Sequence, residues 1–175
     1  FNPYAYSVPN IANWYGLKNT FTTDMFGAIA HYAASNEDVI SVEDGSIGHL
    51  ELNTTIEDFT AAAGYIRTDK DNGAGSMDSV GDNISPFDTG NNTYAADAKT
   101  LYGSVGYTIA DVELGALYGE TKFDADYKEK ELNLTVGYSI TEALATSLLY
   151  GDVNADETNG DVDDKYFLAS VEYTF

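Results

Sequence analysis

Oxygen-bearing side chains that could bind a hard cation cluster in two stretches of the sequence. Asp69, Asp71 and Gly73 follow a D-x-D-x-G spacing, and residues 152–164 are rich in Asp, Asn and Glu. Calcium takes about 6–8 oxygen ligands in flexible geometry, so both stretches are candidate sites. The EF-hand pattern is incomplete, because Val80 stands where its final Glu belongs. A solvated acidic surface is the alternative explanation. The candidate calcium ligands are Asp69, Asp71, Asp161 and Asp163.

Side chains that could act as catalysts are scarce. The chain has two histidines, His31 and His49, no cysteine, and no G-x-S-x-G sequence around any serine. A serine nucleophile needs a neighbouring base and acid, and thiolate metal sites and disulfides need cysteine. We predict that the protein is not an enzyme and that it uses no cofactor other than, at most, calcium.

The net charge of the 175-residue chain is −21, from 29 acidic and 8 basic residues. Nucleic-acid binding needs clustered Lys and Arg, so nucleic acid is excluded as a partner. Hydrophobic residues make up 43% of the chain and are regularly spaced, which argues against disorder. No apolar run approaches the roughly 18 residues of a membrane-spanning helix, but barrel strands escape that criterion because they alternate apolar and polar residues.

The elements that position these side chains are predicted to be β-strands. In residues 129–140, apolar and polar residues alternate with a period of two, which leaves one apolar face. The apolar positions are Leu132, Leu134, Val136, Tyr138 and Ile140. The same pattern predicts strands at 11–18, 24–34, 47–55, 59–67, 100–109, 111–119, 143–151 and in the segment ending at Phe175. We therefore predict an all-β antiparallel fold of about nine strands in a single domain spanning residues 1–175.

Short turns and long polar segments alternate between the predicted strands. Two turns share a sequence pattern, at 107–111 (YTIAD) and 138–142 (YSITE), and 54–58 (TTIED) matches it more weakly. The long segments, rich in Asp, Asn, Gly and Ser, are 35–46, 69–98, 121–128 and 152–163. This asymmetry is typical of a transmembrane β-barrel with turns in the periplasm and loops outside. The long loop 69–98 either folds inward and narrows a pore or stays external.

Aromatic residues fall near both ends of the predicted strands. Those beside the short turns are Tyr107, Tyr138 and Tyr173, and those beside the long segments are Tyr32, Tyr65, Tyr118, Tyr150 and Phe167. Amphipathic rings prefer the two membrane interfaces, so two aromatic levels favour a membrane barrel. The alternative is a soluble β-sandwich, in which Tyr is simply a good strand residue.

The last strand ends in alternate hydrophobic residues, Val171 and Tyr173, followed by the terminal aromatic Phe175. This ending resembles the insertion signal of Gram-negative outer-membrane barrels. With its repeated turns and acidic loops, the pattern of 11–175 resembles the trimeric outer-membrane porins, in particular the major porins of Campylobacter-like bacteria. The resemblance implies a homotrimeric multi-pass barrel in the outer membrane. Its partners would be the barrel-assembly machinery, the membrane lipids and lipopolysaccharide.

The resemblance also implies a passive channel for ions and small hydrophilic solutes. The polar faces of the predicted strands would line the pore, and no Lys or Arg lies well inside a predicted strand. Carboxylates along the wall should favour cations. The predicted pore-lining residues are His49, Glu51, Asn53, Glu113, Glu131, Asn133 and Glu172.

The strand count leaves two architectures open. Nine crossings would place Phe1 on the loop side, whereas complete bacterial barrels have an even strand number and both termini in the periplasm. In one interpretation, this chain is the C-terminal part of a porin of roughly 16 to 18 strands. In the other, residues 1–23 are a tail beside a complete barrel of about eight strands, whose filled interior suits an anchor or adhesin.

Overall fold

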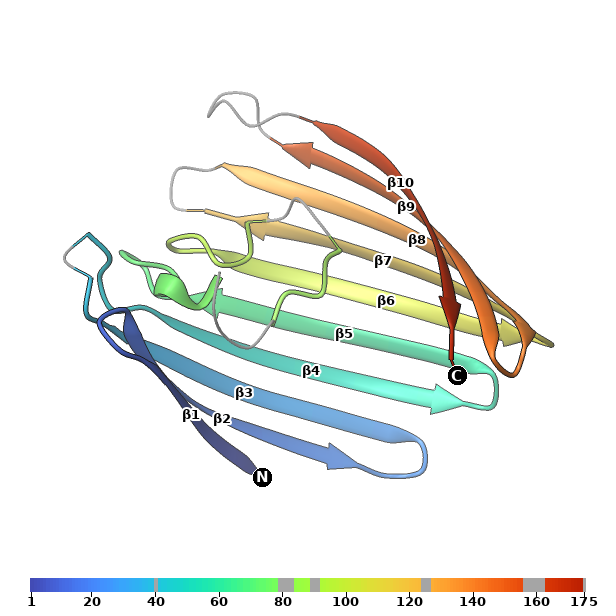
Figure 1. Ribbon diagram of the computed structural model, residues 1–175, viewed down its shortest axis with the longest axis horizontal. Coiled ribbons are helices and arrows are strands. Elements are labelled where there is room, and N and C mark those ends of the chain that lie inside the picture. The colour runs from blue at the N-terminus through green and yellow to red at the C-terminus, as the bar shows by residue number, and fades with distance from the viewer. Residues whose placement is uncertain (40, 79–83, 89–91, 124–126, 156–162, 175) are drawn as a thin grey trace.

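The computed structural model describes residues 1–174 apart from 40, 79–83, 89–91, 124–126 and 156–162. The described residues form ten antiparallel strands in one sheet, in sequence order (Figure 1), and one short 3-10 helix. The elements are β1 (Asn2–Val8), β2 (Ala12–Thr22), β3 (Phe26–Glu37), β4 (Ser46–Ile56), β5 (Phe59–Thr68), η1 (Gly75–Asp78), β6 (Lys99–Ile109), β7 (Val112–Lys122), β8 (Lys128–Thr141), β9 (Leu144–Ala155) and β10 (Asp164–Tyr173). The predicted all-β antiparallel fold is confirmed.

The strand that the sequence pattern missed is β1. Its larger residues, Tyr4, Tyr6 and Val8, alternate with Pro3, Ala5 and Ser7, and Pro3, which has no backbone N–H to donate, stands beside the start of the strand. β2 also runs to Thr22, beyond the predicted end at residue 18. Residues 1–23 are therefore mostly two strands, and the interpretation of them as a tail beside an eight-stranded barrel is wrong.

Ten strands place the two ends of the sheet toward the same rim. Asn2 at the start of β1 lies opposite Lys18, and Tyr173 at the end of β10 lies opposite Leu144. Both ends therefore point toward the rim of the short turns. The prediction that Phe1 lies on the loop side is wrong, because it rested on the odd strand count.

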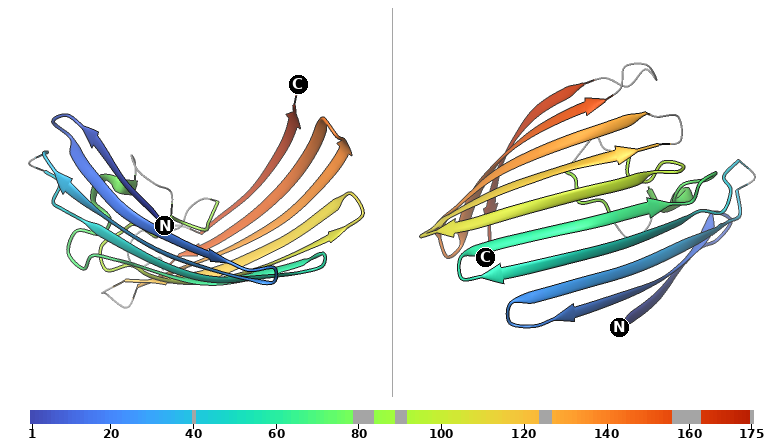
Figure 2. Two further views of the ribbon diagram at one scale, coloured as in Figure 1. Left: turned by 90° about the horizontal axis from the view of Figure 1, so that it is seen from below. Right: turned by 180° about the vertical axis from the view of Figure 1, so that it is seen from behind.

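The sheet curves into an open trough whose two raised sides end in β1 and β10 (Figure 2). Among the described residues no pairing joins β1 to β10, so both strands are sheet edges. Residues directly opposite one another share a face, so the register assigns every strand residue to one face. The face of Leu50 and Tyr65 is here called the convex face, and the face of His49 and Tyr102 is the concave face.

The convex face is a continuous apolar surface open to its surroundings. Leu52 is 70% exposed, Leu101 65% and Phe167 82%, and no second sheet covers them in the described part of the chain. A water-soluble protein rarely exposes a continuous apolar surface over a whole sheet, so this face argues against the soluble sandwich. All eight aromatic residues of the two predicted levels lie on this face.

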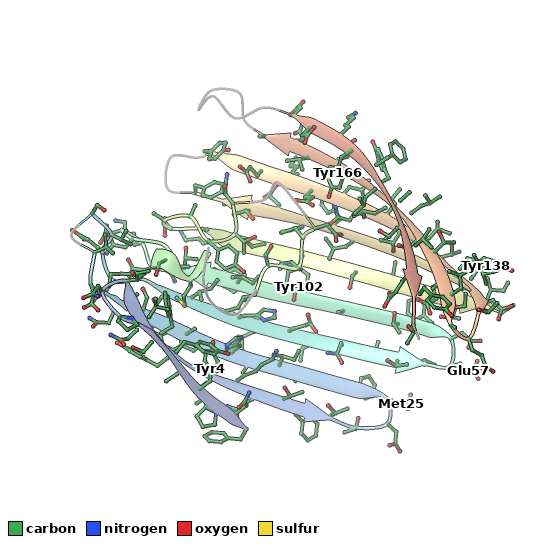
Figure 3. The ribbon with its side chains drawn as sticks, in the orientation of Figure 1. Tyr4, Met25, Glu57, Tyr102, Tyr138 and Tyr166 are labelled. Carbon is green, nitrogen blue, oxygen red and sulfur yellow. The ribbon has the colours of Figure 1, made fainter. Side chains whose placement is uncertain are left out.

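The short turns stack along one rim. A backbone carbonyl in each turn accepts a hydrogen bond from a neighbouring strand, which for β4, β6 and β8 is the strand that enters the next turn; Thr174, the fourth donor, directly follows β10. The pairs are Thr55 N to Met25 O at 3.1 Å, Thr108 N to Asp58 O at 2.9 Å, Ser139 N to Asp111 O at 3.0 Å and Thr174 N to Ala143 O at 2.9 Å. Figure 3 labels Met25, Glu57 and Tyr138 along this rim.

The described parts of the longest connection, 69–98, fold onto the concave face near the opposite rim (Figures 1 and 2). Met77, Ile84 and Phe87 from this segment pack with Trp14 and Tyr102 in a buried apolar cluster. Of the two alternatives for the loop, the described residues therefore adopt the inward fold. Among the described residues, no helix is long and apolar enough to cross a membrane.

Candidate pore lining

The seven residues predicted to line a pore all lie on the concave face. They are His49, Glu51 and Asn53 on β4, Glu113 on β7, Glu131 and Asn133 on β8, and Glu172 on β10. The period of two placed them on one face because each belongs to the polar set of its strand. Their surroundings, however, divide them into three groups.

Three concave tyrosines each lie across a glycine directly opposite on the neighbouring strand. Tyr4 lies over Gly16, Tyr102 over Gly64 and Tyr166 over Gly151. A Cβ added to any of these glycines would meet the tyrosine ring at 2.0–2.3 Å, so the close approach requires glycine. Each hydroxyl then reaches the strand beyond, and Figure 3 shows the three side chains on the concave side. The tyrosines thereby tie together three strands at a time.

The β4 group is joined to β6 through the hydroxyl of Tyr102. This hydroxyl donates to Glu51 Oε2 at 2.6 Å and lies 2.7 Å from His49 Nε2. A carboxylate only accepts, so the Tyr102 hydroxyl donates its proton to Glu51. His49 Nε2 is then the donor to the Tyr102 hydroxyl oxygen. Asn53 Nδ2 donates to the other Glu51 oxygen at 3.1 Å. The half-buried Glu51 carboxylate is thus fixed in place.

The β8 group supports the inward segment. Glu131 and Asn133 are buried, and Asn133 Nδ2 donates to Glu131 Oε1 at 2.8 Å while its Oδ1 lies 3.4 Å from the backbone N of Asp88. Two residues before Glu131 on the same strand, the buried Glu129 accepts a hydrogen bond from the backbone N of Asn92 at 2.8 Å. These acids accept hydrogen bonds from protein donors, which local sequence patterns do not indicate because the contacts depend on the path of 69–98.

Glu113 and Glu172 form the third group and are exposed. Together with Ser139, Ser147 and Ser170 they line a polar hollow of about 200 Å³ on the concave face, near the rim of the short turns. These two carboxylates are therefore in contact with solvent, in contrast to Glu131.

A lysine and two histidines form a strip on the concave face of β2, β3 and β4, away from Glu113 and Glu172. Lys18 lies directly opposite His31, which lies opposite His49, on β2, β3 and β4. Lys18 is well inside β2, so the prediction that no Lys or Arg lies inside a strand is wrong. The reason is the strand boundary, which the sequence pattern placed at Lys18 itself.

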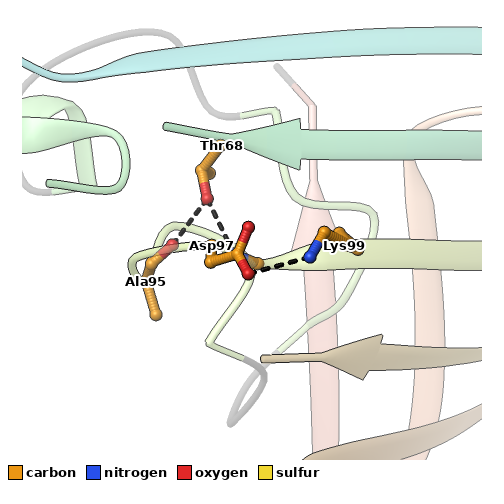
Figure 4. Close-up of polar contacts among 5 residues, drawn as sticks. Thr68, Ala95, Asp97 and Lys99 are labelled. Carbon is orange, nitrogen blue, oxygen red and sulfur yellow. Dashed lines mark hydrogen bonds and ion pairs between the residues drawn. The ribbon is translucent and has the colours of Figure 1, made fainter. Parts of the chain in front are cut away.

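Polar anchors fix both ends of the inward segment. Ser76 on η1 donates from its backbone N to Glu37 Oε1 at 2.9 Å, and its hydroxyl accepts from Trp14 Nε1 at 3.1 Å. At the other end, Thr68 Oγ1 donates to the Ala95 carbonyl at 2.6 Å (Figure 4). Lys99 pairs with the buried Asp97 at 2.8 Å. The segment is thus held to β2, β3 and β5.

The candidate calcium ligands do not converge in the described part of the chain. Asp69 Oδ1 accepts from the backbone N atoms of Asp71 at 2.9 Å and Asn72 at 3.0 Å. These hydrogen bonds hold the pKa of the Asp69 carboxyl below its ordinary value, and the bond from Asn72 has the largest effect. Asp163 accepts from the end of β9, and Asp161 lies outside the described residues. No group of three or more described acids or histidines is arranged to hold a metal, so calcium stays a prediction.

Solved structures similar to this chain are outer-membrane porins. OccAB3 of Acinetobacter baumannii has a TM-score of 0.77 at 17% identity, over 99% of this chain and 51% of that one. OccK3 of Pseudomonas aeruginosa has a TM-score of 0.68 at 16% identity, over 91% and 50%. The KdgM porin has a TM-score of 0.56 at 12% identity, over 99% and 89%.

The chain thus spans about half the length of the Occ structures it matches. No protein-family model matches the sequence, and no curated protein matches it significantly. The fold is that of the outer-membrane β-barrel porins.

Proposed function

We propose that this chain forms part of the wall of an outer-membrane channel through which ions and small hydrophilic solutes diffuse passively. The observation that carries the proposal is the division of the sheet into an exposed apolar convex face and a polar concave face. A membrane barrel needs this division, because lipid meets one face and water the other. The inward segment 69–98 would narrow the channel.

We further propose that the complete barrel has more than these ten strands, roughly 16 to 18. β1 and β10 are both edges, and in hydrocarbon each unpaired backbone N–H or C=O group costs several kcal/mol. Further strands would pair these edges. The half-length match to the Occ porins supports the same size.

Cation preference is proposed from the charges of the concave face. Among the described strand residues, this face carries one Lys or Arg, Lys18, against several carboxylates. Glu113, Asp164 and Glu172 are the exposed ones, so they would act on permeant ions most strongly. The carboxylates are Glu37, Glu51, Glu113, Glu129, Glu131, Asp164 and Glu172.

Planar-bilayer recording of the full-length protein tests both parts of the proposal. We expect stepwise single-channel currents and, in a salt gradient, a reversal potential of the sign given by cation preference. Glu113→Gln with Glu172→Gln should move the reversal potential toward zero. Asp152→Asn, the same kind of charge change on the convex face, should leave it unchanged. Folded protein without current would favour an anchor, and anion preference would refute the charge assignment.

The finer features implied by the resemblance stay predictions. Val171 and Tyr173 lie on the convex face of the edge strand β10, where the barrel-assembly machinery could read them, and Phe175 lies outside the described residues. A homotrimer is expected to give a cross-linked species of three chains in mild detergent. Kinship with the major porins of Campylobacter-like bacteria rests on the sequence pattern alone.

A further inference from the structure

Six of the eight Lys and Arg residues lie on the convex face toward the rim of the long loops, and five of them belong to the neighbouring strands β5 to β8. Arg67, Lys99, Lys122 and Lys128 stand directly opposite one another on β5, β6, β7 and β8. Lys130 follows two residues after Lys128 and so lies on the same face. These five residues, here called the cationic row, stand out in a chain whose net charge is −21.

Within the described part of the chain, the cationic row is only partly neutralised. Like charges directly opposite on neighbouring strands destabilise a sheet. Among the described residues, Glu120 alone serves Lys122, Lys128 and Lys130, at 3.3–4.0 Å, and Asp97 serves Lys99. For the five cations of the row, the described residues thus supply two carboxylates as ion-pair partners. An anionic partner outside the chain would relieve the repulsion.

The row lies at the depth of lipid headgroups if the convex face meets the membrane, as the proposed function requires. Tyr65 belongs to the aromatic level on this side, and Arg67 follows it by two residues on the same face. Tyr118 precedes Lys122 by four residues. At about 3.3 Å per residue, the cations stand roughly 7–13 Å farther along the strands than the rings. Interfacial rings mark the edge of the hydrocarbon, so charged headgroups lie beside the row.

An apolar groove on the same face runs from one end of the row. It has a volume of about 360 Å³ and is lined by Leu17, Tyr32, Gly48, Leu50 and Tyr65, with Arg67 at its rim. A second groove of about 670 Å³ shares Leu50 and Tyr65 and continues past Ala28 and Leu52. The grooves arise because small residues separate large ones. Their length, apolar walls and convex position suit a lipid acyl chain.

We propose that the convex face binds a phosphorylated lipid, with its phosphate on the cationic row and an acyl chain in the groove beside Arg67. Spread over four strands about 4.8 Å apart, the row spans roughly 15 Å, enough for more than one phosphate. Arg67 offers the planar fork that binds phosphate oxygens, and the lysines offer point charges. The lipid thus joins four neighbouring strands at the rim where the sheet carries most positive charge.

The test titrates the full-length protein in neutral detergent with diphosphoryl lipid A and counts bound lipid by native mass spectrometry. Lys122→Gln combined with Lys128→Gln should weaken binding about five-fold per charge, equivalent to about 1 kcal/mol each. Lys18→Gln is the matched control, because it removes the same charge from the concave face. It should leave lipid binding unchanged.

Gly48→Val tests the groove independently of charge. A Cβ at Gly48 would meet no atom closer than 4.0 Å, so the substitution fills the groove without disturbing the backbone. It should weaken binding of the acylated lipid several-fold. Heat-dependent mobility in SDS gels checks that every variant is folded.

Three results would overturn the lipid site: equal binding by Lys18→Gln and the double variant, equal binding of phosphatidylcholine, or displacement of the lipid by an equal concentration of inorganic phosphate. Cross-linking of copies through Lys122 in the presence of lipid would also overturn it, by assigning the row to a protein interface. Channel currents separate this outcome from the proposed function. Wild-type conductance with no lipid selectivity refutes the lipid site alone, whereas absent conductance refutes the channel.

Discussion

At the scale of single residues, the concave face is organised by tyrosines that lie across glycines. A glycine inside a strand costs roughly 0.5–1 kcal/mol relative to alanine, so its presence needs a compensating contact. At Gly64 the compensation is the Tyr102 ring and its hydrogen bond to Glu51. A glycine that seats an aromatic ring also pins the strand register. The polar face of this sheet is therefore ordered by contacts within the protein.

Gly64→Ala should lower the free energy of unfolding by about 1–3 kcal/mol, because the new methyl group displaces the Tyr102 ring. The displaced hydroxyl also leaves Glu51 and His49. Gly103→Ala is the matched control, since a Cβ there meets only the Ala62 carbonyl oxygen, at 3.6 Å. Urea unfolding in lipid vesicles measures both. Equal losses for the two variants would show that the tyrosine contact is not the cause.

The Asp69 carboxyl makes the stability of the structure at the end of β5 depend on pH. Its pKa is lowered in the folded state, so its stabilisation is complete above the unfolded value, about 4, and is lost as the pH falls through the folded value. We expect protease cleavage of 69–98 to rise below about pH 4. Asp69→Asn keeps the side-chain acceptor and should remove the pH dependence, whereas Asp69→Ala should raise cleavage at neutral pH as well. Unchanged cleavage in Asp69→Ala would contradict this role.

At the scale of elements, two short turns place a non-glycine residue at positive φ. Glu57 has a φ of 52° and Ala110 a φ of 51°, each directly after the last residue of a strand. L-residues pay a steric cost in this region, whereas glycine does not. The turns at 54–58 and 107–111 thus share a backbone shape that glycine would suit better, whereas at 138–142 the corresponding residue, Thr141, still belongs to β8.

Ala110→Gly should therefore raise the free energy of unfolding by about 0.5–1 kcal/mol, despite the greater freedom of glycine in the unfolded chain. Ala116→Gly, in the extended part of β7, is the control and should lower it by about 1 kcal/mol or more. Chemical denaturation of both variants in vesicles gives the comparison. Destabilisation by Ala110→Gly would mean that the turn tolerates its alanine without strain.

Most of the elements could be predicted from the sequence, because period two survives wherever lipid-facing and polar faces alternate. The hairpin at 129–151 and the face shared by His49, Glu51 and Asn53 follow from that period. β1 could not be predicted, because its large residues lie on the concave face and Pro3 resembles a loop signal. The period indicates a face and says nothing of what covers it.

The candidate site could be predicted only in part, for the same reason. Glu113 and Glu131 have the same sequence signature, an acid on the polar face of a strand. Glu113 is exposed and Glu131 is buried beside Asn133, which meets the inward segment. That difference depends on the path of 69–98 and on pairings such as Tyr166 over Gly151, which join residues distant in sequence. Local patterns carry no information about such contacts.

At the scale of the whole molecule, the described strands form a trough and not a closed barrel. Each strand from β2 to β9 is paired on both sides, and the turn-to-strand hydrogen bonds extend this order along the rim. The apolar convex face requires lipid, and lipid forbids unpaired edges. The described sheet thus leaves backbone groups of β1 and β10 unpaired, whereas a lipid environment requires these groups to be paired.

Cysteine cross-linking can decide how the edges are covered, and these 175 residues contribute no native cysteine to the background. If β1 and β10 pair with further strands, Ala5→Cys combined with Ala169→Cys, both on the convex face, should not be joined by a short bismaleimide in the membrane-inserted protein. Thr146→Cys with Val171→Cys, directly opposite on paired strands, should be joined readily. Efficient joining of residues 5 and 169, or of residue 5 with cysteines at 167 or 171, would mean that the ten strands close on themselves. The channel would then be narrower than proposed, because barrel diameter grows with strand number.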